Sequence, residues 1–555
     1  MEDIHMTQGN LDCIVIGYNE MPFENYERLL FRYGENSEAY RDLKYSFVDI
    51  GDKKLNYVDL LNHTFAQAYS NGNGSSPKDE FKSGDIPSLA AVYLANFLKK
   101  RGFEAKYINL FQYEKEKLAE YLAQDPICVA ITTTFYLINQ PVIEMVDFIR
   151  DHNDEVMIIA GGPLIANHHR RHPPDSLPYV LDDIGADIYV IESQGENTLS
   201  EIVRCLKHGG SLEMIPNIVF LNDDDLPQMT APRPENNSLD LNFINWQDFP
   251  DEELGPTLQT RTARSCAFSC AFCGYPARAG KLTLAGLDTI EEELDTMYAL
   301  GDVENVVFID DTFNVPLKRF KDICRLMIKK KYGFKWFSYF RCSNSDEEAI
   351  ELMAEAGCKG VFLGIEAGSA TILMNMNKAA TLEKYIVGIQ RLNEHDILTF
   401  GSFITGFPGE TDGTVKETID FINFTKPSYF RSQLWYCEPG TPIYSQRDKY
   451  NIMGEGFKWE HSTMNSTQAM DHIDQMYLST TESTWLPQWS FDFWFIPYIL
   501  GKGVTLPQFK HFMEGANKML TLNIQPPSEE EKQKVRQEAL QHITNGIRDW
   551  QIRDV

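Results

Sequence analysis

The octapeptide Cys266-Ala267-Phe268-Ser269-Cys270-Ala271-Phe272-Cys273 follows a strand-like run at 257–264 and precedes a glycine. Its C-x3-C-x2-C spacing can place three thiolates on one small loop, enough to ligate three irons of a cubane cluster and leave the fourth iron open. A structural zinc site and unrelated thiols are the alternatives. A closed zinc site takes four N or S ligands, however, and no fourth cysteine or histidine lies near in the sequence. The spacing predicts an iron–sulfur loop with Cys266, Cys270 and Cys273 as metal ligands.

At these cysteines the sequence resembles the radical S-adenosylmethionine (SAM) superfamily, whose C-x3-C-x2-C loop carries a [4Fe–4S] cluster. The resemblance implies that SAM chelates the open iron and that an electron from the cluster cleaves SAM to a 5′-deoxyadenosyl radical. It also implies an external electron donor such as flavodoxin or ferredoxin. Phe272 and Gly274, beside the last cysteine, are implied as part of the SAM site.

Composition limits the class of protein. The 555 residues are enough for two or three domains, and 43% hydrophobic with 24% charged residues is typical of a globular chain. The formal charge of −29 argues against a nucleic-acid substrate, because phosphate binding needs a basic surface. The other cysteines are scattered, and we find no signal peptide and no membrane-spanning apolar run. These features predict a cytoplasmic enzyme that does not insert into a membrane.

Strands and helices alternate in the first part of the chain. Strand-like runs occupy 11–18, 103–110, 127–133, 156–160 and 187–191, with helical periodicity between most of them, and 218–221 adds an edge strand. This alternation predicts an α/β, doubly wound parallel sheet that binds its ligand at the carboxyl ends of the strands. A polar stretch at 70–84 is predicted as a surface loop.

Those strand ends carry small and hydroxyl residues. A nucleotide-binding or purely structural Rossmann-like domain is the alternative, but no G-x-G-x-x-G follows the first strand. Together with the cysteine loop, the pattern resembles the cobalamin-binding domain of B12-dependent radical SAM enzymes. Because an Asp-x-His-x-x-Gly is absent from the sequence, the resemblance implies base-off, His-off cobalamin, with Phe135 and Tyr136 over its lower face. The implied contacts are Thr132, Thr133, Thr134, Phe135, Tyr136, Gly161, Gly162, Pro163, Glu192 and Gly195.

A second α/β region follows a Pro- and Asp-rich linker at 226–256. Residues 257–449 show about six βα repeats, which predicts a partial (β/α)6 barrel with its chemistry at the carboxyl ends of the strands. The strand at 305–309 ends in Asp310 and Asp311. These two carboxylates are candidate general acid or base groups, or else caps of the helix that begins near 317.

Four further positions are candidate SAM contacts. Arg341, near a strand end, can meet a carboxylate by a bidentate contact, or belong to a surface ion pair. The resemblance implies that Glu366, after the next strand, meets the ribose or the amino group of SAM. It further implies that Ser402 and Gly406, in the Gly-rich stretch 400–410, lie against the adenine.

Residues 450–555 lack the alternation and are rich in aromatic side chains, so we predict a mostly helical C-terminal domain that covers the substrate. His461 is a candidate for proton transfer, and Cys437 is a candidate thiol near the site. The expected layout is a Rossmann-like cobalamin-binding domain with an N-terminal extension at 1–225, the linker, the radical SAM barrel at 257–449, and this helical domain.

The resemblance implies a methyltransferase in which one SAM methylates cobalamin, a second SAM yields the radical, and the substrate radical takes the methyl group. Several shorter runs, including Tyr40-Arg41-Asp42-Leu43, resemble the PhpK-type P-methyltransferases. The acceptor is then an unactivated carbon or a phosphinate phosphorus of a small molecule or peptide. A B12-dependent rearrangement, cyclisation or oxidation without methyl transfer, and a non-catalytic corrinoid or iron–sulfur protein, remain as alternatives.

Overall fold

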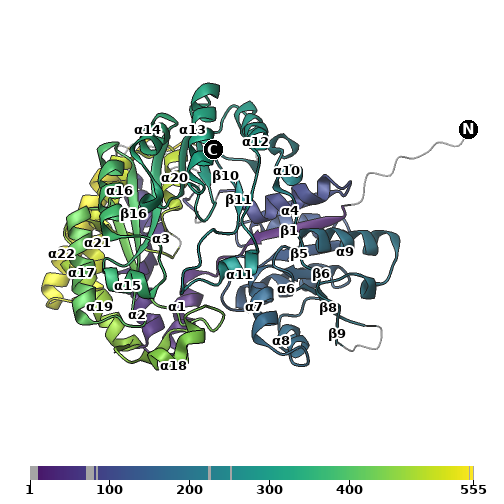
Figure 1. Cartoon of the computed structure of the whole chain (residues 1–555), viewed down its shortest axis with the longest axis horizontal. Helices are drawn as coiled ribbons and strands as arrows, with labels where there is room; N and C mark the ends of the chain where they lie inside the picture. Colours follow the sequence, from purple (N-terminus) through teal and green to yellow (C-terminus); the bar gives the residue numbers. More distant parts are fainter. Residues whose placement is uncertain are drawn as a thin grey trace, which may run out of the picture. The chain divides into compact units, whose positions relative to one another are not determined.

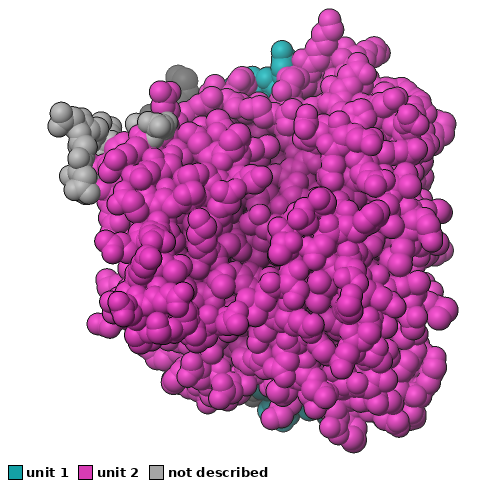
Figure 2. Space-filling view, turned by 90° about the vertical axis from the view of Figure 1, so that its left-hand side faces the viewer, with its two compact units in different colours: residues 1–21, 87–253, 283–300 teal, residues 22–86, 254–282, 301–555 magenta. Residues whose placement is uncertain are grey.

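The computed structural model describes residues 11–70, 80–82, 86–222, 227–250, 253–489, 491–548 and 550–553. Most of the loop expected at 70–84 lies outside these residues. The chain divides into two compact units, coloured separately in Figure 2. Unit 1 comprises Met1–Met21, Pro87–Glu253 and Thr283–Leu300, and unit 2 comprises Pro22–Ile86, Leu254–Leu282 and Gly301–Val555. No described helix is long and apolar enough to cross a membrane.

Unit 1 is built on a seven-stranded sheet of order β4-β1-β5-β6-β7-β8-β9 (Figure 1). The first five strands in this order are parallel. At one edge, β8 pairs antiparallel with β7, and β9 pairs antiparallel with β8. The strands are β1 Cys13–Tyr18, β4 Ala105–Leu110, β5 Cys128–Thr132, β6 Met157–Gly161, β7 Ile188–Val190, β8 Ile218–Leu221 and β9 Pro227–Met229. The central strands are almost wholly apolar because helices cover both of their faces.

The helices of unit 1 fall into two groups. α4 packs with α9, α5 packs with α6, and α7 packs with α8. The sheet extends from β1 in both directions, and right-handed connections then place the helices on opposite faces. Their bounds are α4 Leu89–Lys99, α5 Lys115–Leu122, α6 Gln140–His152, α7 Pro163–Arg171, α8 Leu177–Asp182, α9 Glu196–His208, α10 Leu239–Asn242 and α12 Leu287–Ala299. The expected mixed α/β class with parallel sheets is confirmed.

Unit 2 contains a second seven-stranded parallel sheet, of order β10-β13-β14-β15-β16-β17-β21. Its strands are β10 Thr257–Thr260, β13 Asn305–Phe308, β14 Lys335–Tyr339, β15 Cys358–Glu366, β16 Leu398–Thr405, β17 Tyr429–Leu434 and β21 Thr484–Trp485. The first six follow the βα order predicted from the sequence. The seventh, β21, comes from the segment that we expected to be helical, and it pairs with β17.

Helices follow most of these strands. They are α11 Tyr275–Ala279, α13 Leu317–Lys330, α14 Glu347–Glu355, α15 Ala370–Asn375, α16 Leu382–Glu394 and α17 Asp412–Thr425. Local capping fixes several starts: the Asp346 carboxylate accepts the Ala349 N–H at α14, and Thr411 and Thr414 form a capping box at α17. Phe308, Phe320 and Trp336 pack together on the α13 side of the sheet.

The opposite side of this sheet is covered by an aromatic segment. Tyr339, Phe362 and Phe400 lie in one row across β14, β15 and β16, and Phe493 packs on both Phe362 and Phe400. Phe493 is fully buried. The segment at 491–495 therefore belongs to the core of unit 2 and lines the face of the sheet that the helices leave free.

Most of the remaining elements of unit 2 come from the two ends of the chain, and β11 precedes the cysteine loop. They are α1 Phe23–Phe31, α2 Glu38–Leu43, β2 Phe47–Ile50, β3 Lys53–Asn56, α3 Tyr57–Ser70, β11 Ala263–Arg264, α18 Arg447–Tyr450, β18 Met453–Glu455, β19 Lys458–His461, β20 Met464–Asn465, α19 Ser466–Ser479, α20 Phe495–Gly501, α21 Leu506–Ile524 and α22 Glu529–Ile547. Residues 22–86, expected with the first domain, thus fall in unit 2, and the C-terminal part includes the three-stranded sheet β18-β19-β20.

Candidate functional site

The cysteine loop leaves β11 at Ser265, which adopts a positive φ of 71°. Backbone hydrogen bonds hold the loop on two sides: the Ala271 N–H donates to Met376 at 2.8 Å, and the Ile443 N–H donates to Ala271 at 2.8 Å. All three thiols are free, and Cys270 is the most buried of them. The loop is thus held by contacts with residues far along the chain.

The arrangement of the thiols suits a cluster better than a single ion. Within the described residues, the three sulfurs do not all lie within 4.8 Å of one another. A cubane needs no such close set, because it takes one cysteine per iron. Burial, the largest influence, raises the pKa of Cys270, while Lys378 and Arg341 lower it. Two cations therefore stand close enough to stabilise thiolates, and we conclude that the loop fits a [4Fe–4S] cluster.

Arg341, predicted from its strand end, lies against this loop. Its guanidinium stacks on the Phe268 ring at 3.6 Å from the centroid. The side chain of Asn314 accepts the Arg341 N–H at 2.9 Å and donates to its carbonyl at 3.0 Å. Although Arg341 is only 6% exposed, Nε and Nη2 have no hydrogen-bond partner. A buried cation with two free donors suits an anionic ligand group.

Glu366 ends β15 with a positive φ of 70°. Its carboxylate pairs with Lys378 Nζ at 2.9 Å, and both side chains are close to nine-tenths buried. Gly364 leaves space for this carboxylate, because a Cβ at that position would lie 2.7 Å from Glu366 Oε1 and would displace it. Lys378 also lies 5.6 Å from the centre of the Phe272 ring in the cysteine loop. The ion pair therefore links the end of β15 to the loop.

The Gly-rich turn after β16 is fixed from both sides. Gly406 has a φ of 92°, and a Cβ there would lie 2.4 Å from the Trp459 ring. The Gly406 N–H donates to the buried Glu410 carboxylate, and its carbonyl accepts Nε2–H of His461 at 3.0 Å. Burial raises the pKa of Glu410 to about 8. His461, expected in proton transfer, is buried against Trp459 and is placed instead as a positioning residue.

The two neighbouring aspartates have different surroundings. Asp310 is 2% exposed and accepts the N–H groups of Thr262 and Ala263 at 2.7 and 2.9 Å, together with the Thr262 hydroxyl. It holds the segment that leads into the cysteine loop and is not free to exchange protons with a ligand. Asp311 is more exposed than Asp310, and desolvation of its carboxyl group raises its pKa to about 6. Of the pair, Asp311 keeps the properties of an acid–base group.

The remaining predicted residues of unit 2 differ in accessibility. Cys437 is fully buried, its thiol donates to the Gly454 carbonyl at 3.7 Å, and burial raises its pKa to about 12, so it offers neither a thiolate nor a free surface. Ser402 is buried in β16 in register with Arg431 of β17. Gly274 precedes α11.

Four residues outside the predicted site, Tyr339, Arg431, Asp492 and Trp494, lie on the side of this sheet that the aromatic segment covers. Trp494 donates from Nε1 to the Tyr339 hydroxyl at 3.2 Å. Arg431, 2% exposed, lies 3.5 Å from Asp42, and its Nε and Nη1 have no hydrogen-bond partner. Burial raises the pKa of Asp492 to about 6, and Arg431 lowers it. This face combines aromatic rings with buried charge.

In unit 1 the carboxyl ends of the strands are joined by threonine side chains. Thr132 donates to the Gly17 carbonyl at 2.6 Å, and Thr133 donates to the Gly161 carbonyl at 2.9 Å. Gly162 has a φ of 113°, and a Cβ there would lie 3.0 Å from Thr133 Oγ1. These hydroxyls are used within the protein, so the edge offers backbone and small side chains to a ligand.

Apolar side chains next to this edge are exposed. Phe135, Leu137 and Ile138, after β5, are 69%, 70% and 41% exposed. Tyr136 between them is buried, and its hydroxyl accepts the Asn19 N–H at 2.6 Å, so the expectation that its ring covers a ligand does not match its place in the core. Such a group of exposed apolar residues fits a large, partly apolar ligand.

The other predicted residues of unit 1 follow β6 and β7. Pro163 begins α7, and Gly195 precedes α9. A Cβ on Gly195 would lie 2.3 Å from the Val190 side chain. Burial raises the pKa of Glu192, whose carboxylate accepts the Gln194 N–H at 3.4 Å. Thr134 is exposed. All of them lie at the carboxyl ends of the strands, as predicted.

Comparison with known proteins identifies the region around the cysteine loop. Residues 260–422 match the model of the Radical SAM superfamily. An uncharacterized methyltransferase of Pyrococcus horikoshii is 24% identical over 402 residues, which cover 71% of this chain and 85% of that protein.

Two solved structures share the fold. The radical S-adenosylmethionine methyltransferase TsrM from Kitasatospora setae, with cobalamin and a [4Fe–4S] cluster bound, is 15% identical and covers 82% of this chain and 96% of its own, with a TM-score of 0.58. The cobalamin-dependent S-adenosylmethionine radical enzyme OxsB, with aqua-cobalamin bound, is 14% identical and covers 89% and 85%, with a TM-score of 0.55. At these identities the likeness is one of fold.

Proposed function

We propose that this chain, an enzyme with a radical SAM domain, is a cobalamin-dependent radical SAM methyltransferase acting on a small molecule or peptide. The observation that carries the proposal is the three-cysteine loop with Arg341 and Lys378 beside it, in a chain whose other sheet ends in exposed apolar side chains. The methyltransferase relatives support the transfer chemistry, and the TsrM and OxsB structures support a cobalamin site in unit 1.

Each unit would hold one part of the cofactor set. Cys266, Cys270 and Cys273 would ligate a [4Fe–4S] cluster, and the edge of unit 1 at Gly162 and Phe135 would hold cobalamin without a histidine ligand. When bound, the cluster supplies the electron that cleaves SAM, and cobalamin supplies the methyl group. The protein's own residues bind, orient and exclude water.

SAM recognition would rest on three elements of unit 2. Arg341 would meet the SAM carboxylate with its two unpartnered donors. Glu366, held by Lys378, would accept from the ribose or the amino group. The turn at Gly406, fixed by Glu410 and His461, would pack against the adenine.

The substrate would lie beside Tyr339 and Trp494, and Asp311 would take or return a proton there. The acceptor is an unactivated carbon or, as in the PhpK-type enzymes that the sequence resembles, a phosphinate phosphorus. An external flavodoxin or ferredoxin would deliver the electrons.

The test is anaerobic reconstitution of the full chain with iron, sulfide and hydroxocobalamin, followed by mass spectrometry after SAM, reductant and candidate substrates are added. We expect 5′-deoxyadenosine and S-adenosylhomocysteine together. 5′-Deoxyadenosine without S-adenosylhomocysteine would favour rearrangement, cyclisation or oxidation. If protein that retains both cofactors forms neither product, the chain is a non-catalytic corrinoid protein. Cys205→Ala, which alters a half-buried thiol of α9, is the control.

A further inference from the structure

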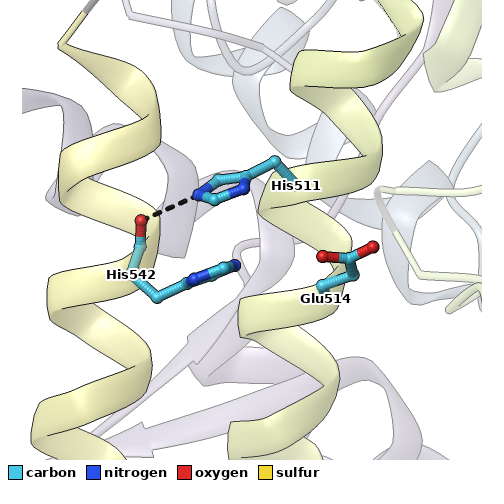
Figure 3. A group of neighbouring side chains, drawn as sticks. All are labelled: His511, Glu514 and His542. Carbon is cyan, nitrogen blue, oxygen red and sulfur yellow. Dashed lines mark hydrogen bonds between the residues drawn. The ribbon is translucent and has the colours of Figure 1, made fainter.

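Two histidines and a glutamate meet where the last two helices pack together (Figure 3). His511 and Glu514 lie one turn apart on α21, and His542 lies opposite them on α22. One ligand atom from each of the three residues lies within 4.8 Å of the others, and no other such group occurs in the described part of the chain. The cluster belongs to unit 2 and is separate in sequence from every residue assigned above to the cofactor sites.

A hydrogen bond from one ring nitrogen of His511 leaves the lone pair on the other ring nitrogen. Its Nε2–H donates to the backbone carbonyl of His542 at 3.0 Å, shown as the dashed line in Figure 3. Because a carbonyl only accepts, this bond leaves the lone pair of the neutral ring on Nδ1. A ring N–H donated to a backbone carbonyl is the usual partner of a metal-bound histidine, since it fixes the tautomer and the ring orientation.

The second histidine has an unused nitrogen. Nε2 of His542 is buried and has no hydrogen-bond partner, and its ring stacks on that of His511 with centroids 3.8 Å apart. A neutral imidazole binds a metal ion through such a nitrogen. Leaving that nitrogen buried without a partner is unfavourable unless a ligand binds it.

Two glycines make room for these rings. A Cβ on Gly546 of α22 would lie 2.1 Å from the His511 ring, and a Cβ on Gly515 of α21 would lie 3.2 Å from the His542 ring and 2.4 Å from Ile543. Glycine disfavours a helix more than any residue except proline. Its presence at both crossing points permits the close approach that brings the two imidazoles together.

We propose that His511 Nδ1, His542 Nε2 and the Glu514 carboxylate bind one divalent transition-metal ion such as Zn²⁺, with water in the open position, and that the ion ties α21 to α22. Two imidazoles and one carboxylate are a common ligand set for Zn²⁺ and its neighbours in the first transition row, whereas Mg²⁺ prefers oxygen ligands throughout. Glu514 is exposed, so the ion can enter from solvent.

The test uses the full chain with its cluster reconstituted, so that iron occupies the cysteine thiolates. The protein is titrated anaerobically with Co²⁺ and with Zn²⁺ in competition, and bound metal and the unfolding midpoint are measured, with Mg²⁺ as the reference ion. We expect one bound Co²⁺ with the absorption of nitrogen and oxygen ligation, displaced by Zn²⁺, and a higher unfolding midpoint with Zn²⁺ but not with Mg²⁺.

The variants decide whether these three residues are the ligands. His542→Gln is expected to abolish the bound Co²⁺, and Glu514→Gln, at an exposed position that folding tolerates, to weaken it by about tenfold or more. His472→Gln is the matched control, because His472 lies 3.1 Å from Asp412 without a third ligand. Equal Co²⁺ binding by the wild type and both site variants would overturn the proposal, whether or not the chain cleaves SAM.

Discussion

The two sheets carry different residues at the strand ends where we propose that ligands bind. In unit 1 the strand ends are small or are bonded within the protein, and the exposed side chains beside them are apolar. In unit 2 the strand ends carry cysteines and buried charges, including an arginine with unused donors. The first edge suits a large ligand held by shape and contact area. The second suits small charged groups held by electrostatic attraction and hydrogen bonds.

The largest effect is expected when the cysteines are removed, which tests whether the two sites bind their cofactors independently. Alanine at Cys266, Cys270 or Cys273 is expected to lower 5′-deoxyadenosine formation to background and to remove iron, because the cluster loses a ligand. Cobalamin retained after purification should not change, since its proposed site is in unit 1. Metal analysis and absorption spectra of the variants, with Cys205→Ala beside them, measure both. If the variants lose cobalamin together with iron, the proposed sites of unit 1 and unit 2 do not bind their cofactors independently.

The second prediction concerns the buried ion pair of unit 2. Lys378→Met leaves the Glu366 carboxylate buried without its partner, which we expect to cost about 3–5 kcal/mol of unfolding free energy. Glu366→Gln combined with Lys378→Met should recover much of the loss, because no unpaired charge remains. Urea unfolding at neutral pH gives the values. Equal losses in the single and double variants would mean that charge burial is not the cause.

The third prediction is a pH effect from Glu410. Burial raises its folded pKa to about 8 from an ordinary value of 4.5, so between these values the folded state holds a proton that the unfolded state has released. Stability is therefore full below the ordinary value and falls as the pH rises through 8, by about 3–5 kcal/mol.

Glu410→Gln stays neutral and can still accept the Gly406 N–H, so the stability of this variant should lack the contribution of Glu410 to the pH dependence. Unfolding curves of wild type and variant from acid to mildly alkaline pH check the sign. A wild type that grows more stable with rising pH over the same range, relative to the variant, would show that the carboxyl group is ionised in the fold.

The fourth prediction tests recognition of an anionic group. Arg341→Gln is expected to raise the KM for SAM by about 10- to 100-fold, because charge-assisted hydrogen bonds are lost. Its iron content should stay that of the wild type. Arg325→Gln, at an exposed arginine paired with Glu348, is the control. An unchanged KM would remove Arg341 from the SAM site.

The smallest effect is expected at the edge of unit 1. Gly162→Ala puts a Cβ against Thr133 at a positive φ, so we expect cobalamin affinity to fall by about tenfold and stability by about 1–2 kcal/mol. Gly209→Ala has a similar positive φ, 73°, but open space around its Cβ, and it isolates the backbone cost. If both variants bind cobalamin equally, packing at Gly162 does not shape the site.

The local features of this chain were readable from sequence. The cysteine loop, the alternating strands and helices, and Arg341 and Glu366 at strand ends follow from spacing and periodicity within short windows. Lys378, Asn314 and Arg431 were missed because each acts through a residue distant in the chain, as Arg431 does with Asp42. No short pattern distinguishes them from surface residues.

Three further expectations depend on surroundings that a sequence does not show. Asp310, His461 and Cys437 were chosen for side-chain chemistry, but burial and hydrogen bonds decide what that chemistry can do. Asp310 holds the backbone of Thr262, His461 holds that of Gly406, and Cys437 is buried as a neutral thiol. The residue types are visible in the sequence, whereas their burial and hydrogen bonds depend on the fold.

The aromatic segment at 491–495 has a consequence for how the protein is made. It lies near the end of the chain, yet it covers the sheet that ends in the cysteine loop, about 220 residues earlier in translation. At roughly 5–20 residues per second the ribosome needs on the order of ten seconds to reach it. During that interval the sheet face that this segment covers in the folded chain has not yet received it, so the core of unit 2 is completed only well after the cysteine loop has been synthesised.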